Sequence, residues 1–203
     1  MAPAGKLHIA SAASAGKINL NGSEAAAPTA PAYGPVTVSG NAVADVGDSS
    51  GQRGGGAVQV RGGAVLIDGS TVRARNSSNQ PGGTVSVKAD ALTLRGGGTL
   101  TTSARASGDA GAISVQTTGS ITVNGDGTSR LTGISSSALA GSSGRAGSVS
   151  VASGGELRVT MGGTLGNQTY GTGRAEPVSV TAPKITVDAT GSSAPSTVGS
   201  FVN

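Results

Sequence analysis

Residues 83–102, GTVSVKADALTLRGGGTLTT, hold the pattern that decides the fold. They open on a glycine and a small residue, followed by aliphatic and polar residues in alternation, as Gly83-Thr-Val-Ser-Val87. Two further short segments follow, Leu92-Thr-Leu94 and Leu100-Thr-Thr102. Alternation with a period of two is typical of a strand that buries one face. The stretch therefore predicts three short strands separated by turns.

The opening phrase recurs along the chain. Its other copies are GAVQV at 56–60, GAISV at 111–115, GSVSV at 147–151 and, with the glycine lost, EPVSV at 176–180. Their first aliphatic residues are numbers 58, 85, 113, 149 and 178, so the intervals are 27, 28, 36 and 29 residues. About eight extra residues around 124–132 account for the longest interval. A fixed period of this length indicates a repeat architecture.

The second and third phrases recur as well. The second phrase follows each copy of the first by seven or eight residues, as Val65-Leu-Ile67, Leu92-Thr-Leu94, Ile121-Thr-Val123, Leu157-Arg-Val159 and Ile185-Thr-Val187. The third phrase follows four of these, as Val72-Arg-Ala74, Leu100-Thr-Thr102, Ile134-Ser-Ser136 and Leu165-Gly-Asn167. Each repeat of roughly 28 residues thus carries about three short strands.

One such repeat cannot bury its aliphatic side chains, but stacked repeats can. Strands of successive coils would pair in parallel, about 4.8 Å apart. The first phrase then gives one interior column, Val58, Val85, Ile113, Val149 and Val178, and the second gives another, Val65, Leu92, Ile121, Leu157 and Ile185. The predicted fold is an all-β, parallel β-helix (a solenoid). Right-handed winding is the general rule for parallel crossovers.

The composition fits this narrow interior and excludes several classes of site. Glycine supplies 36 of 203 residues, and the only aromatic residues are Tyr33, Tyr170 and Phe201. The absence of cysteine excludes a disulfide scaffold and thiolate chemistry, and a lone His8 excludes a multi-histidine metal centre. The net charge is only +4, and the arginines are scattered without interleaved aromatics, so we expect no nucleic-acid partner.

The repeats divide the chain into three parts. Residues 1–53 are expected to form irregular β-helix coils with a loop insertion near 22–35, and residues 54–188 to form the regular repeats. Residues 189–203 are a Ser/Thr/Gly-rich tail or the start of the next coil. No apolar run is long enough to span a membrane, and Met1 does not open a signal peptide. We expect the chain to be a segment of a longer protein.

Several runs resemble a known family. They are Gly108-Asp-Ala-Gly-Ala-Ile-Ser-Val115, Gly119-Ser-Ile-Thr-Val123, Thr132-Gly-Ile-Ser-Ser-Ser137 and Gly144-Arg-Ala-Gly-Ser-Val-Ser-Val151. These runs are similar to the repeat region of filamentous haemagglutinin-like exoproteins, the large secreted partners of two-partner secretion in Gram-negative bacteria. The resemblance covers about residues 54–187, and the family's N-terminal secretion domain is not visible. It implies a right-handed β-helix, export through an outer-membrane barrel transporter, and a role in adhesion or aggregation at the cell surface.

The acidic residues do not form a recognisable catalytic or metal site. Asp126, in Asn124-Gly-Asp-Gly127, and Asp109 are interpreted as turn residues, because tandem calcium-binding repeats are absent. Glycoside hydrolysis needs two facing carboxylates. Asp68, Asp90 and Asp188 are predicted to lie near turns and not at equivalent outward positions.

Other candidates also have structural explanations. Arg73 and Arg75 would point outward from one strand, either on a solvated face or toward an anionic glycan. His8, the only histidine for a Ser-His-Asp arrangement, lies in the least regular segment. The glycine runs 54–56 and 96–98 do not lead into helices and are not phosphate loops. Chance explains the glycosylation-type sequons at Asn21, Asn76 and Asn167.

The outward serines suggest a surface for contact. Ser86, Ser114, Ser150 and Ser179 would stack into a polar ladder that either solvates the sheet or makes weak multivalent contacts. The repeat without clustered reactive groups favours a structural stalk without catalytic residues, metal or cofactor, and the resemblance implies a secreted or surface-exposed adhesin-type segment. Expected partners are the outer-membrane transporter, glycans or proteins of host or bacterial surfaces, and a second copy. An autotransporter passenger segment and a β-helix polysaccharide-active enzyme are the alternatives.

Overall fold

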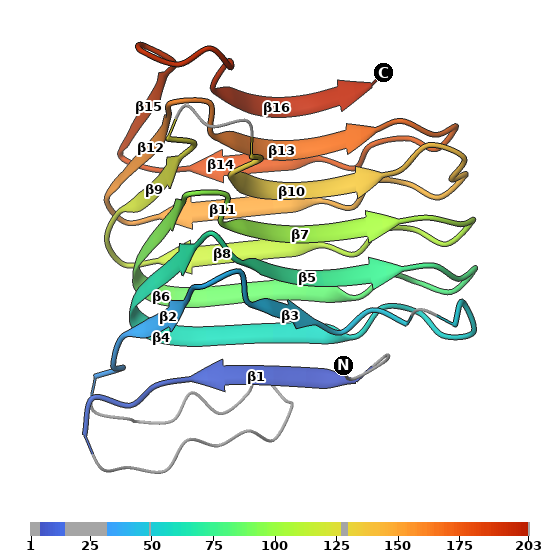
Figure 1. The fold of residues 1–203 in the computed structure, drawn as a ribbon, viewed down its shortest axis with the longest axis horizontal. Coiled ribbons are helices and arrows are strands. Elements are labelled where there is room, and N and C mark those ends of the chain that lie inside the picture. The colour runs from blue at the N-terminus through green and yellow to red at the C-terminus, as the bar shows by residue number, and fades with distance from the viewer. Residues whose placement is uncertain (1–4, 15–31, 49, 127–129, 203) are drawn as a thin grey trace.

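The chain winds into a parallel β-solenoid of about six coils (Figure 1). The computed structural model describes residues 5–14, 32–48, 50–126 and 130–202. Within these ranges every regular element is a strand, and no helix is long and apolar enough to cross a bilayer. The predicted all-β, parallel β-helix with about three strands per coil is confirmed.

Each coil contributes a strand to each of three faces. The first face contains β1 (Lys6–Ala10), the first part of β4 (Ala57–Asp68) and of β6 (Thr84–Arg95), β8 (Ile113–Thr117), β11 (Val149–Ser153) and β14 (Val178–Thr181). The second face contains β2 (Val36–Val38), the rest of β4 and β6, β9 (Ile121–Asn124), β12 (Glu156–Thr160) and β15 (Lys184–Asp188). The third face contains β3 (Val43–Asp45), β5 (Thr71–Asn76), β7 (Thr99–Ala104), β10 (Gly133–Ala138), β13 (Thr164–Thr169) and β16 (Thr197–Val202).

The first two phrases of a repeat do not always form separate strands. In β4 and β6 they run through one bent strand, and β8 and β9 pair with the two halves of β6. The first and second faces therefore belong to one ten-stranded sheet, while the third face is a separate six-stranded sheet.

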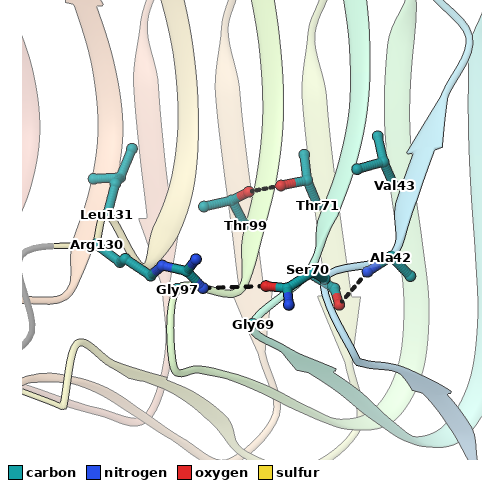
Figure 2. Close-up of a pocket in the computed structure, with 10 residues that line it drawn as sticks. Ala42, Val43, Gly69, Ser70, Thr71, Gly97, Thr99, Arg130 and Leu131 are labelled. Atoms are coloured by element: carbon teal, nitrogen blue, oxygen red, sulfur yellow. Dashed lines mark hydrogen bonds between the residues drawn. The ribbon is translucent and has the colours of Figure 1, made fainter.

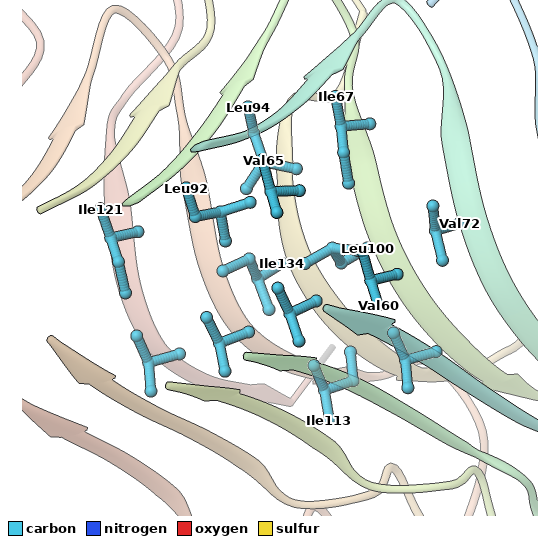
Figure 3. Packing of buried hydrophobic residues seen from close by; sticks show 14 of the residues in the cluster. Val60, Val65, Ile67, Val72, Leu92, Leu94, Leu100, Ile113, Ile121 and Ile134 are labelled. Atoms are coloured by element: carbon cyan, nitrogen blue, oxygen red, sulfur yellow. The ribbon is translucent and has the colours of Figure 1, made fainter. Parts of the chain in front are cut away.

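The two predicted interior columns are confirmed by the strand register. Val58, Val85, Ile113, Val149 and Val178 are successive partners, and so are Val65, Leu92, Ile121, Leu157 and Ile185. Most of these side chains are at most 2% exposed, and Figure 3 shows how they pack inside the solenoid. In the last coil of this chain the column is only partly covered, and Ile185 is 47% exposed.

The interior behind the third face is partly polar. The column Val72, Leu100, Ile134 and Leu165 is aliphatic, but the next inward positions along the strands carry Thr102, Ser136 and Asn167. Thr102 Oγ1 donates to the Gly111 carbonyl at 2.6 Å, and Ser136 Oγ accepts from the Gly147 amide at 2.8 Å. These side chains satisfy inward backbone groups of the turns, which burial would otherwise leave unpaired.

The ends of the chain are more regular than the repeat phrases indicated. Residues 197–202 form β16, which pairs with β13 and completes the last coil, so this part of the predicted tail is a strand. Near the other end, β1, β2 and β3 supply one strand to each face. Most of the insertion expected near 22–35 lies outside the described residues, and Tyr33 forms an antiparallel bridge with Ala12.

Candidate functional site

The predicted serine ladder is present on the first face. Ser86, Ser114, Ser150 and Ser179 are successive partners on β6, β8, β11 and β14, and Gln59 precedes them on β4. Because paired strands lie about 4.8 Å apart, the row offers hydroxyl groups at that spacing along the solenoid axis. Ser114, Ser150 and Ser179 are exposed, so the row is open to a partner.

A shallow hollow of about 430 Å³ lies over part of this ladder. Its lining includes Gln59, Ser86 and Ser114 from the ladder, with Lys88 and Gln116 from a second outward row of the same face. Amide, hydroxyl and ammonium groups together donate and accept hydrogen bonds. The hollow is therefore suited to a polar, uncharged or weakly acidic chain lying across the coils.

Arg73 and Arg75 point outward from β5, as predicted, but they face an acid that the sequence pattern did not identify. Asp45 Oδ2 accepts from Arg73 Nε at 2.9 Å and from Arg75 Nη2 at 2.7 Å. The Asp45 side chain is only 3% exposed, and its Oδ1 accepts from the Gly47 amide at 2.8 Å. Asp45 thus forms ion pairs with both arginines and links β3 to β5 of the next coil. We call this three-residue cluster the clasp.

The electrostatics of this clasp favour an ionised carboxylate. Burial raises the pKa of Asp45, but the hydrogen bonds from Gly47 and Arg73 and the charges of Arg73 and Arg75 outweigh it, so the pKa lies below its usual value. A carboxyl with a lowered pKa stabilises the fold at neutral pH, and this contribution is lost as the pH falls through the folded-state pKa. The clasp stabilises the first coils at neutral pH.

A second candidate surface lies where the second face turns into the third. A hollow of about 330 Å³ lies at this corner. Figure 2 shows residues that line it, among them Val43, Thr71, Thr99, Arg130 and Leu131. Another hollow of about 330 Å³ lies farther along the axis, and Arg130 and Leu131 line it too. Both residues belong to the extra segment of the longest repeat, whose spacing revealed an insertion but not its position on the surface.

The carboxylates are spread along the solenoid. The prediction that Asp68 and Asp188 occupy non-equivalent positions is wrong, because both lie in one outward column, with Arg95, Asn124 and Thr160 between them. Four strand spacings separate them, about 19 Å. Asp68 is paired with Arg95 at 2.8 Å. The column therefore does not present two facing carboxylates.

Asp90, Asp109 and Asp126 serve local structure. Asp90, in β6, accepts a hydrogen bond from the Thr118 hydroxyl at 3.2 Å, and Asp109 accepts from the Arg145 amide at 2.8 Å. Asp126 has a positive φ of 54° and accepts from the Gly96 amide at 2.7 Å, as expected of a turn residue. Within the described ranges, His, Cys, Asp and Glu side chains form no group of three that could hold a metal ion.

The other sequence candidates are also placed. His8 lies on β1 opposite Gln59, at the start of the serine ladder. Asn76 and Asn167 are 1% and 0% exposed, so neither can serve as a glycan acceptor on the folded chain. Gly96 and Gly97 have positive φ values of 57° and 89°, as a tight turn requires, whereas the run 54–56 lies against the backbone of neighbouring coils. Asn21 lies outside the described residues.

Comparison with known proteins does not assign a function to the chain. No family model, no curated protein and no solved structure matches the chain.

Proposed function

We propose that this chain is a segment of a secreted or surface-exposed bacterial adhesin-type exoprotein, in which the β-helix is a structural stalk for cell adhesion or aggregation. The observation that carries the proposal is the unbroken parallel pairing that joins β1 to β14 and β3 to β16 along the axis. Continuous ladders around a packed interior make a stiff rod whose outer faces stay available for contact.

The outer faces suit contact better than turnover. One polar row repeats once per coil on the first face, so a partner with a repeating surface meets the same group several times. Weak contacts of this kind add up through a high effective concentration. By contrast, the Asp68–Asp188 separation of about 19 Å far exceeds the roughly 5–10 Å between paired carboxylates of glycosidases.

Export belongs to the same proposal. The repeat phrases of residues 54–187 resemble those of filamentous haemagglutinin-like exoproteins, whose partner is an outer-membrane barrel transporter. A thin solenoid that folds coil by coil suits such a route, because each coil needs only its neighbour for pairing. The proposed location is therefore the outside of the cell, secreted or associated with the outer membrane.

The proposal is tested with beads that carry the purified chain and are washed over bacterial and epithelial cells under flow. We expect retention that rises more steeply than linearly with the density of the chain, because many weak contacts must act together. Beads that carry Ile113→Asp, which breaks the core, are the matched control and should be released. Retention equal to that of albumin-coated beads at every density would contradict the proposal.

A further inference from the structure

One of the outward rows of the third face lies next to the corner described above. Its members are successive strand partners, Val43, Thr71, Thr99, Gly133, Thr164 and Thr197. The two corner hollows of about 330 Å³ lie over the two ends of this row. Each volume is at the lower end of the range for small-molecule sites. We call this row together with the two hollows the groove, and it runs along the solenoid axis for about 24 Å from the first coil to the last. In its middle Thr99 is only 7% exposed and Gly133 is buried.

Arg130 and Leu131 stand at the middle of this groove and line both hollows. The Arg130 side chain lies over Gly97, where a Cβ atom would come within 3.1 Å of Arg130 Cδ. Its Nη1 donates to Asn41 Oδ1 of the first coil at 3.2 Å. Packing on Gly97 and bonding to Asn41 hold the guanidinium in place, so less entropy is lost when a ligand binds.

The guanidinium keeps most of its hydrogen-bonding capacity. Arg130 is exposed and has five N–H groups, of which the bond to Asn41 uses one. Among the described residues, no carboxylate forms an ion pair with Arg130, and neither hollow has an acidic side chain in its lining. A planar guanidinium with unused donors binds carboxylates in a bidentate manner. The charge of the groove thus favours an anionic ligand.

The surroundings of Arg130 favour a sugar. Thr99 Oγ1 donates to Thr71 Oγ1 at 3.0 Å, which leaves the Thr71 hydroxyl hydrogen free to donate to a ligand. Val43 and Leu131 are 56% and 52% exposed, and Figure 2 shows them along one line with the two threonines. Hydroxyl groups beside aliphatic surface match a pyranose ring, whose hydroxyls point outward and whose C–H faces are apolar.

We propose that this groove binds a carboxylated oligosaccharide, a chain of uronic acid type, with one carboxylate on Arg130 and neighbouring sugars in the two hollows. The proposal concerns a different surface from the serine ladder. It adds a defined ligand class to the contact function but does not depend on retention of beads by cells.

The test is titration calorimetry of the whole chain with tri-galacturonate, and with its methyl ester as the uncharged comparison. Arg130→Gln removes the charge but keeps a polar amide side chain. We expect this variant to lose at least about ten-fold in affinity, or about 1.4 kcal/mol. Arg174→Gln is the matched control, because Arg174 is an exposed arginine outside both hollows. It should bind as the unchanged chain does.

Four outcomes would overturn the proposal. The unchanged chain could fail to bind tri-galacturonate, or could bind its methyl ester equally well. Arg130→Gln and Arg174→Gln could lose affinity equally, or a glutamate peptide of the same charge could bind as tightly. Equal losses would mean attraction to net charge alone, and the peptide result would exclude a preference for sugars. If Arg130→Gln has the same thermal unfolding midpoint as the unchanged chain, its loss of affinity does not come from a loss of folding. Bead retention, measured separately, distinguishes failure of this site from failure of the adhesin proposal.

Discussion

Ile113→Asp is expected to unfold the middle coils of the solenoid. Ile113 is 1% exposed and lies in the interior column between Val85 and Val149. A carboxylate at this position would be buried without a partner, which costs several kcal/mol even when the group is protonated to avoid the charge. Because each coil is stabilised mainly by its neighbours, the loss should spread to the coils on either side.

The matched control is Ser114→Asp, the same change one residue later. Ser114 is exposed on the first face, so its carboxylate would stay in water. We expect limited proteolysis to cut Ile113→Asp rapidly within the coils that contain β6, β8 and β11, and to leave Ser114→Asp as resistant as the unchanged chain. Equal cleavage of the two variants would show that the inward and outward positions have been assigned to the wrong sides.

Gly111→Ala is expected to have an effect of similar size for a different reason. A Cβ atom at Gly111 would lie 1.1 Å from the Gly83 carbonyl oxygen, and one at Gly83 would lie 1.8 Å from the Gly56 carbonyl oxygen. The obstructing atoms belong to the backbone, so no side-chain rotation relieves the overlap. The coils must separate, and we expect more than about 3 kcal/mol of lost stability, above the usual cost of overpacking a core.

Gly141→Ala separates this steric effect from the general cost of replacing a glycine. Gly141 has a positive φ of 80°, but no atom lies within 4 Å of the position of its Cβ. The change should therefore cost only the strain of a left-handed alanine, about 1–2 kcal/mol. Urea unfolding of both variants provides the comparison. A Gly111→Ala midpoint no lower than that of Gly141→Ala would contradict the close stacking of Gly56, Gly83 and Gly111.

Much of the fold could be predicted because the pattern repeats. Alternation of period two assigns each residue of a strand to one face, and a shift of one residue would turn the whole aliphatic set outward. Val85 and Leu92 could therefore be placed in their columns directly. The strand 197–202 was harder to identify, because 13 residues separate Ile185 from Val198, whereas seven or eight residues separate the second and third phrases in three of the four other repeats.

The candidate sites also differ in whether they follow the repeat. The serine ladder follows the repeat, so its register could be predicted from the first phrase. Asp45 and Arg130 do not follow it. Asp45 contacts arginines 28 and 30 residues away, and Arg130 reaches Asn41 across 89 residues. Such contacts depend on how the turns of different coils stack on one another. The local sequence pattern does not predict that stacking.

The strands form a single stiff stack whose outward rows repeat once per coil. Because the chain has no cysteine, paired spin labels can be attached at His8→Cys with Ser150→Cys, and at His8→Cys with Ser179→Cys. These positions lie in one outward row, four and five strand spacings apart. Pulsed electron paramagnetic resonance should give narrow distributions near about 19 and 24 Å, differing by one strand spacing. Broad distributions, or two pairs at the same distance, would show that the coils do not form one regular, stiff stack.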